Sequence, residues 1–208
     1  MGIKGLLIDV GGVLVQTIDT AKREVWEKRL HLVSGELTNE VYLIEPADRA
    51  TVGKASYEEI WQDIQKRFSL SDTDMDQLKI DFSAGDQLNL EFYNYIKKIR
   101  SQYKTIILSN AWKDERDIYT NHYHLDKIVD EMIISAEVGM KKPDENIFKF
   151  ALEKLGTLPE ETLFIDDTKE NIHEAKQLGI PSILFIDTDT TIYAMEKILG
   201  NHSSFQTL

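Results

Sequence analysis

The chain has 208 residues, of which 42% are apolar, and its 36 acidic against 24 basic side chains give a net charge of −12. This length allows one domain with a substantial core, and the acidic balance disfavours nucleic acid and anionic membrane surfaces as partners. Because there is no cysteine, no secretion signal and no apolar run of roughly 18 residues, the composition predicts a cytoplasmic protein without disulfides or thiol chemistry.

Short apolar runs rich in Ile, Leu and Val predict the strands of a parallel sheet. They do not alternate with polar residues, as is typical of strands that helices cover on both faces. The runs are GLLID (5–9), TIILSN (105–110), MIIS (132–135), TLFIDD (162–167) and SILFID (182–187).

Helical patterns separate the later runs. One apolar stripe runs from Ile147 to Leu155 and is followed by Gly156, and another runs from Ile172 to Leu178 and is followed by Gly179. Because strands and helices alternate, we expect right-handed crossovers and a doubly wound α/β fold.

About ninety residues separate the first two runs, which is far more than one crossover helix needs. We predict an all-helical insert at residues 16–85, within a core made of residues 1–15 and 86–208. A helix over 89–101 leads back into the core, and the tail after Gly200 is expected to be loosely held. Ser56 and Glu59 form a capping box at one helix start. The apolar stripes of the insert are Val25, Trp26 and Leu30; Ile60, Trp61, Ile64 and Phe68; and Met75, Leu78 and Phe82.

Polar side chains follow three of the predicted strands, where ligands of open parallel sheets bind. They are Asp9, the pair Ser109 and Asn110, and the pair Asp166 and Asp167. A fourth candidate, Lys142, follows the third run in GMKKP. Together they offer a carboxylate nucleophile, groups that anchor an oxyanion, a cation, and oxygen ligands for Mg²⁺. This set indicates phosphoryl transfer, in which positioning and charge neutralisation carry most of the catalysis.

These residues lie in four motifs, IDVGGVL, ILSN, KKPDENIF and FIDDTKEN, in this order. With them, the chain resembles the haloacid dehalogenase-like hydrolase superfamily over nearly its whole length. The resemblance implies a Rossmann-like core with a helical cap inserted after the first motif. It also implies a small phosphorylated metabolite as substrate, and the chain is expected to be a monomer or a homodimer.

The resemblance assigns roles residue by residue. Asp9 is similar to the nucleophile that forms an aspartyl-phosphate, and Lys142 to the lysine that bridges the phosphate and the nucleophile. Ser109 and the backbone after it, with Asn110 and Gly12, are expected in substrate binding. For Mg²⁺ the implied ligands are Asp9, Asp166, Asp167 and the main-chain carbonyl of Gly11. Trp112 is the aromatic residue most expected to face the site.

Phosphatases that this sequence resembles usually carry Asp where it has Gly11, and that Asp is the general acid and base. Its loss would typically lower the rate by ~10²–10⁴. Three explanations stay open. The substrate has a good leaving group such as a sugar 1-phosphate, as in active subgroups similar to glucose-1-phosphate phosphatases with Gly here. A cap residue (Asp19, Glu24 or His31) or the substrate supplies the acid. Or the chain binds a phosphorylated ligand without turnover.

A 2-haloacid dehalogenase is a further alternative, because that reaction uses an attacking Asp and needs neither the second acid nor Mg²⁺. The halide-releasing branch typically lacks the paired acids of the fourth motif, whereas this sequence keeps Asp166 and Asp167. Two carboxylates beside a third repel one another unless a cation lies between them. The sequence therefore favours a Mg²⁺-dependent phosphatase over a dehalogenase.

Overall fold

The computed structural model describes residues 2–200, so the tail that was expected to be loosely held lies outside the described residues. Its centre is a sheet of five parallel strands in the order β5-β4-β1-β6-β7. All five strands coincide with the predicted apolar runs to within a few residues. They are β1 (Gly5–Ile8), β4 (Lys104–Ser109), β5 (Glu131–Ile134), β6 (Thr162–Asp166) and β7 (Ser182–Leu184).

Strand β1 lies in the middle of this sheet, where Ile8 is in register with Ile107 of β4 and with Ile165 of β6. From β1 the chain builds β4 and β5 on one side, then returns to build β6 and β7 on the other. The carboxyl end of β1 is therefore the point where the strand order reverses, which is where open α/β sheets bind ligands. Asp9 is the next residue.

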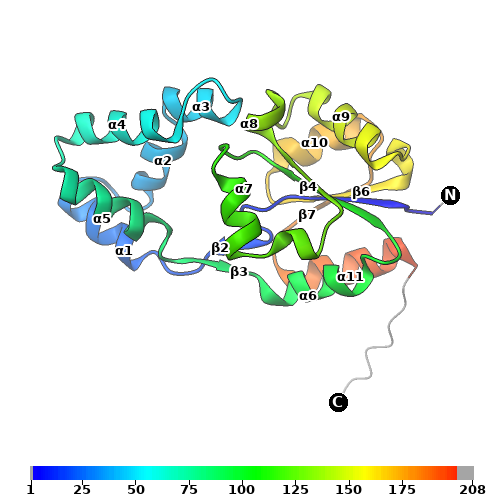
Figure 1. Ribbon diagram of the computed structural model, residues 1–208. Helices are drawn as coiled ribbons and strands as arrows, with labels where there is room; N and C mark the ends of the chain where they lie inside the picture. Colours follow the sequence, from blue (N-terminus) through cyan, green and yellow to red (C-terminus); the bar gives the residue numbers. More distant parts are fainter. Residues whose placement is uncertain (1, 201–208) are drawn as a thin grey trace, which may run out of the picture.

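Helices cover both faces of the sheet (Figure 1), which confirms the predicted doubly wound fold. Leu6 and Ile8 lie in one apolar core with residues of two helices, and Leu7 lies in a second core with residues of two others. Because neighbouring side chains of a strand point to opposite faces, a run without polar residues fills both cores. The helices of the first core are α6 (Leu90–Ile99) and α11 (Thr188–Leu199), and those of the second are α9 (Glu145–Leu155) and α10 (Lys169–Gln177).

Five helices form the insert between the first two strands of the sheet, on the left in Figure 1. They have their own apolar core, which includes Trp26, Ile60, Ile64 and Leu78. The capping box of Ser56 and Glu59 is present at the start of the fourth helix. The helices are α1 (Ala21–Arg29), α2 (Glu36–Tyr42), α3 (Glu45–Thr51), α4 (Tyr57–Phe68) and α5 (Asp72–Ser83).

The insert differs from the all-helical prediction where it joins the core. There β2 (Val15–Thr17) and β3 (Asp86–Leu88) form a separate antiparallel pair, so residues 16 and 17 are strand. Each strand has three residues, which is too short for a periodic pattern to show in the sequence.

The first predicted stripe of the insert was wrong at Val25, which is 64% exposed. Trp26 of the same helix is buried as expected, beside Arg23. The arginine turns inward because its guanidinium donates to the carbonyl oxygen of Phe82 and to Asp86. An ionic group thus takes a place where periodicity alone expects an apolar one.

Several short elements had no signal in the sequence. They are α7 (Glu115–Asp117), η1 (Ile118–His122), η2 (Leu125–Lys127), α8 (Ser135–Val138) and η3 (Pro159–Glu161).

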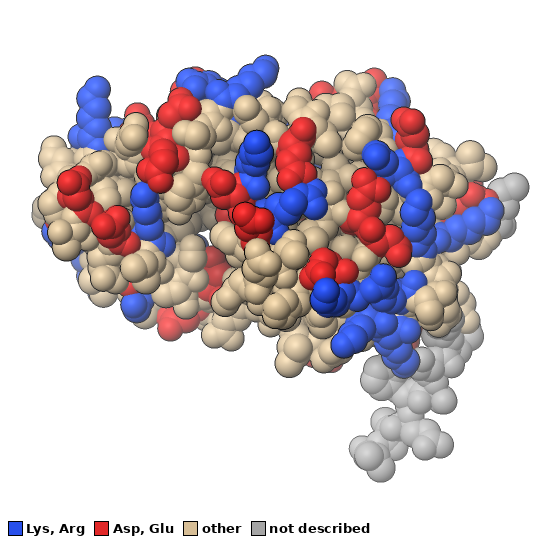
Figure 2. All heavy atoms as spheres, in the orientation of Figure 1, with Lys and Arg blue, Asp and Glu red and all other residues tan. Residues whose placement is uncertain are grey.

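In residues 2–200 no helix is long and apolar enough to span a bilayer. Acidic and basic side chains are intermingled over the face shown in Figure 2.

Candidate active site

Asp9 lies at the carboxyl end of the central strand, and only 8% of the residue is exposed. Its main-chain N–H donates to the carbonyl oxygen of Ile165 at 3.0 Å, which continues the pairing with β6. One carboxylate oxygen accepts the N–H of Val10 at 2.7 Å. The strand therefore fixes the direction in which this carboxylate points.

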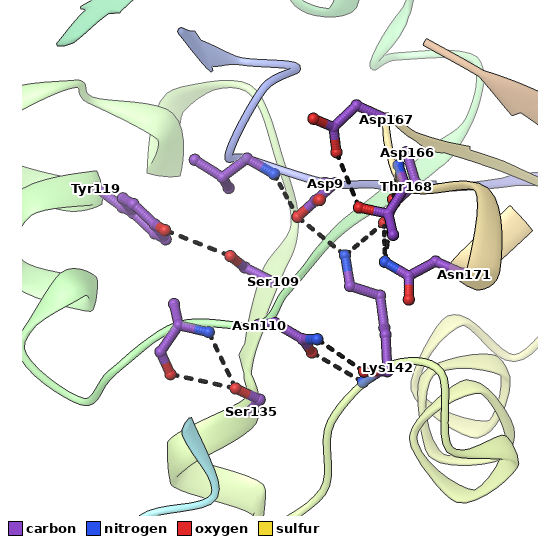
Figure 3. Close-up of polar contacts among 12 residues, drawn as sticks. Asp9, Ser109, Asn110, Tyr119, Ser135, Lys142, Asp166, Asp167, Thr168 and Asn171 are labelled. Atoms are coloured by element: carbon purple, nitrogen blue, oxygen red, sulfur yellow. Dashed lines mark hydrogen bonds and ion pairs between the residues drawn. The ribbon is translucent and has the colours of Figure 1, made fainter. Parts of the chain in front are cut away.

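The ammonium group of Lys142 lies between two carboxylates (Figure 3), 2.9 Å from Oδ1 of Asp9 and 2.6 Å from Oδ2 of Asp166. Lys142 is almost fully buried. Both polar atoms of the Asn110 side chain bond to the main chain of Lys142, each at 2.8 Å. The Asn110 amide thus holds the loop that carries the lysine.

Asp166 ends β6 and has no exposed surface. Its oxygens accept the amide of Asn171 at 3.0 and 3.1 Å, and Oδ1 also accepts the N–H of Thr168 at 2.7 Å. Asn171, which lies one turn into α10, therefore fixes the carboxylate from behind.

Asp167 is exposed and lies on the open side of the site (Figure 3). It packs directly against Gly12, where an added Cβ would lie 1.9 Å from Oδ2 of Asp167. Gly12 also has φ +73°, in the left-handed region that favours glycine. A side chain at residue 12 would therefore adopt an unfavourable backbone conformation and displace the carboxylate of Asp167.

The three carboxylates fit a divalent cation. Asp9, Asp166 and Asp167 each offer an oxygen, and these oxygens all lie within 4.8 Å of one another. Lys142 supplies one positive charge against three negative ones, so the group keeps an excess of negative charge in a poorly hydrated place. Carboxylate oxygens are the ligands that Mg²⁺ prefers.

The charges of the site shift the pKa values of its members. Burial raises the pKa of Asp9 to about 7; Lys142 opposes this shift and the charge of Asp166 adds to it. Burial opposes the charged form of Lys142, but Asp9 and Asp166 outweigh it and raise the pKa of the lysine. Burial and the charge of Asp166 raise the pKa of Asp167. Removing one member would leave the others unpaired, which is costly inside a protein.

A cavity of about 530 Å³ opens in front of Asp9. Its inner end is lined by residues that the sequence analysis proposed for the site, namely Asp9, Gly11, Gly12, Ser109, Asn110 and Asp167. Lys142 and Asp166 lie behind Asp9. Lys142 contacts Asp9, and Asp166 contacts Lys142. The structure thus brings the predicted residues together at one point.

Ser109 is buried at the end of β4, and its Oγ lies 3.3 Å from the hydroxyl of Tyr119. Tyr119 belongs to η1 and also lines the cavity. The sequence gave no indication of this contact, because a π-helical turn follows neither helical nor strand periodicity.

The outer half of the cavity is built from residues that sequence reasoning missed. Arg23, Thr38 and Tyr42 come from the insert, Asp86 from β3, and Glu115 from α7. None of these residues belongs to a motif. The three residues proposed as substitutes for the missing acid, Asp19, Glu24 and His31, are not among the described residues that line this cavity.

Trp112 lines the cavity, as expected. It follows β4 but packs into the apolar core of the insert, 5.4 Å from the ring of Tyr42 between centroids. The motif that carries Ser109 is therefore joined directly to the insert by this ring.

The family model described as haloacid dehalogenase-like hydrolase matches residues 37–185, which is well over half of the chain. This chain belongs to that family. The doubly wound sheet of this structure agrees with membership of this family, and the matched residues include part of the helical insert.

Two curated relatives of this hydrolase differ in how much of their length it spans. The bifunctional epoxide hydrolase 2 of Rattus norvegicus is 36% identical over 102 residues, which is 47% of this chain but 18% of the rat enzyme. This hydrolase thus spans less than a fifth of that relative. The D-ribitol-5-phosphate phosphatase of Bacteroides thetaiotaomicron is 26% identical over 187 residues, covering 85% of this chain and 89% of that phosphatase.

A crystal structure of a haloacid dehalogenase family enzyme from Bacteroides thetaiotaomicron, in complex with magnesium and inorganic phosphate, superposes with a TM-score of 0.77. Sequence identity is 23%, and the match covers 92% of this chain and 100% of the other. At this identity the likeness establishes the shared fold of the core and the insert.

Proposed function

We propose that this hydrolase is a Mg²⁺-dependent phosphatase of small phosphorylated metabolites that acts through a phosphorylated Asp9. One observation carries the proposal: Asp9 lies at the floor of a cavity, hydrogen-bonded to Lys142, with oxygens of Asp166 and Asp167 within 4.8 Å. A nucleophile, a cation and spare carboxylates at one point suit phosphoryl transfer. The relatives that are phosphatases support this proposal.

The chemistry follows from the positions of the side chains. A carboxylate oxygen of Asp9 bonds to phosphorus while the bond from phosphorus to the leaving oxygen breaks, and the electron pair leaves with that oxygen. A water oxygen then bonds to phosphorus, the bond from phosphorus to Asp9 breaks, and the carboxylate is restored. One proton of this water passes to solvent and balances the proton that the leaving oxygen takes up from solvent. Lys142, held between Asp9 and Asp166 behind the cavity, offsets part of the negative charge of the site in both steps.

Asp9, Asp166, Asp167 and the main-chain carbonyl of Gly11 would hold the Mg²⁺ ion. When bound, the ion neutralises negative charge on the phosphoryl oxygens and on the three carboxylates. Ser109 and the main chain at Gly12 and Asn110 are proposed to hold the phosphate, since all three residues line the inner end of the cavity.

The proposed substrates have good leaving groups, such as sugar 1-phosphates, because Gly11 supplies no acid. Residues 16–85 are proposed to act as a cap that covers the substrate and excludes water, with residues 1–15 and 86–208 as the core. The acidic composition and the absence of cysteine support a cytoplasmic enzyme acting on small molecules.

The test is phosphate release from p-nitrophenyl phosphate and a panel of sugar phosphates, with Mg²⁺ and with EDTA, for the wild type and Asp9→Asn. We expect turnover that needs both Mg²⁺ and Asp9. Asn keeps the size of Asp, and a circular dichroism spectrum checks the fold of the variant.

Two other results would replace the proposal. Phosphate binding by calorimetry without turnover on any substrate would indicate a phospholigand-binding protein with a decayed site. Halide release from 2-haloacids that EDTA leaves unchanged would indicate a dehalogenase, since that reaction needs Asp9 but no metal.

A further inference from the structure

The cavity extends well beyond the space that a phosphate group needs. Its volume is about 530 Å³, and its outer half is lined by the insert, β3 and α7. In the proposed reaction this half receives the leaving group, because the phosphate end is fixed at Asp9. The side chains of this half therefore decide which leaving groups fit.

Glu115 is the carboxylate of this outer half that lacks a partner. It is partly buried, and its carboxyl group makes no hydrogen bond or ion pair with any residue between 2 and 200. A carboxylate accepts hydrogen bonds through both oxygens, and leaving them unmade in a poorly hydrated place is unfavourable. A ligand group is thus free to supply the donors.

Arg23, the cation of the outer half, does not pair with Glu115, because its guanidinium already donates to other groups. Arg23 donates to the carbonyl oxygen of Phe82 at 2.6 Å, to Oδ1 of Asp86 at 2.9 Å and to Thr38 at 3.4 Å. Arg23 is therefore held by these partners and makes no hydrogen bond or ion pair with Glu115 in the described part of the chain. The outer half of the cavity keeps the negative charge of Glu115.

We propose that Glu115 is a specificity residue that binds the leaving group through its hydroxyl groups and rejects leaving groups that carry a carboxylate. This inference rests on the proposed phosphatase function and assigns its substrates to phosphates with an uncharged, hydroxyl-rich leaving group, such as sugar 1-phosphates. A site that places a charge against the wrong substrate discriminates by repulsion as well as by attraction.

The pKa of this group agrees with that role. Burial without a partner raises the pKa of Glu115 to about 7, with the charges of Asp86 and Asp114 adding to the effect. The ionised form therefore lacks stabilisation in the free protein and gains it from hydroxyl donors of a ligand.

The experiment compares two substrates that differ at one group. Glucose 1-phosphate carries a hydroxymethyl group where glucuronate 1-phosphate carries a carboxylate, and both have an anomeric leaving group. At pH 8, where Glu115 is ionised, we expect the wild type to prefer glucose 1-phosphate in kcat/KM. In Glu115→Gln we expect that preference to fall by roughly tenfold or more, chiefly through a lower KM for glucuronate 1-phosphate.

Asp117→Asn is the matched control. It removes the same charge from the same short helix, but the Asp117 side chain is exposed and lies outside this cavity. We expect its preference to equal that of the wild type. An unchanged preference in Glu115→Gln would overturn the inference. The inference would also be wrong if the loss of kcat/KM in Glu115→Gln followed the pKa of the leaving alcohol and not its charge, because that pattern is typical of a general acid.

A binding measurement separates this inference from the proposed function. Asp9→Asn and the double variant Asp9→Asn, Glu115→Gln are titrated with both phosphates by calorimetry in the presence of Mg²⁺. If the binding preference depends on Glu115 but the wild type shows no turnover, the specificity role holds and the phosphatase function is wrong. If the ratio of the two Kd values is equal in both variants and the wild type turns over normally, the phosphatase function holds and the specificity role is wrong.

Discussion

Gly11 and Gly12 are neighbours with opposite structural requirements. Gly12 has φ +73°, and a Cβ placed on it would displace the carboxylate of Asp167. Gly11 has φ outside the left-handed region, and apart from its chain neighbours no described residue between 2 and 200 has a heavy atom within 4 Å of a Cβ placed on it. Backbone geometry therefore explains why residue 12 is glycine but does not require glycine at residue 11.

Gly11→Asp should restore a general acid to the site. We expect kcat/KM for glycerol 3-phosphate, which has a poor leaving group, to rise by on the order of 10²-fold. The rate with p-nitrophenyl phosphate should change much less, because its leaving group departs without a proton. Steady-state kinetics with both substrates measure the difference.

Gly11→Asn is the control for size and polarity, because its amide cannot transfer the proton. An equal rise in Gly11→Asn would assign the gain to binding. Equal effects of Gly11→Asp on both substrates would contradict the explanation that a good leaving group compensates for the missing acid.

The inner end of the site could be predicted from the sequence, whereas its outer end could not. Asp9, Ser109 and Asp166 each end an apolar run, and the ends of parallel strands converge. Glu115 and Arg23 reach the cavity only through the packing of a three-residue helix and of the insert. Their positions follow from long-range contacts that leave no local pattern.

Between the insert and the core, the two connecting segments lie against each other. The N–H of Ile18 donates to the carbonyl oxygen of Gly85 at 2.9 Å, beside the β2–β3 pair. A Cβ added to Gly85 would lie 1.7 Å from the carbonyl oxygen of Asp19. These segments therefore fit together only if residue 85 has no side chain.

Gly85→Ala should separate the two segments. We expect the free energy of unfolding to fall by about 1–3 kcal/mol, as is typical when a packed site receives an extra methyl group. Urea unfolding followed by circular dichroism measures the change. Gly2→Ala is the control, because apart from its chain neighbours no residue that the structure describes lies within 4 Å of the added Cβ. An equal stability of the two variants would show that the segments move apart at no cost.

The insert itself was predicted better than its junction with the core. Its helices carry apolar stripes and one capping box, and these signals are local. The β2–β3 pair forms between segments about seventy residues apart in the sequence. Such pairing depends on the closed fold and leaves no periodicity in either segment.

Across the whole molecule, the net charge of −12 favours solubility but opposes compaction through self-repulsion. Any variant that removes an acidic group relieves part of that repulsion. An unpartnered carboxylate in a cavity adds a local free-energy cost to this general self-repulsion. Neutralising an exposed acid removes only self-repulsion, whereas neutralising a partly buried acid removes both contributions.

Glu115→Gln should stabilise the protein at pH 8 and have little effect at pH 5. The pKa of Glu115 is raised in the folded state from 4.5 to about 7, so the folded protein holds the proton more tightly than the unfolded chain does. The contribution of Glu115 to the free energy of unfolding therefore falls as the pH rises from 4.5 to 7, and it stays low above that range. At pH 8 we expect Gln to recover roughly 1–3 kcal/mol. Urea unfolding at both pH values, with Asp117→Asn as the exposed control, measures this recovery. If both variants stabilised the protein equally at pH 8, general self-repulsion would account for the gain, and Glu115 would carry no local cost for a ligand to relieve.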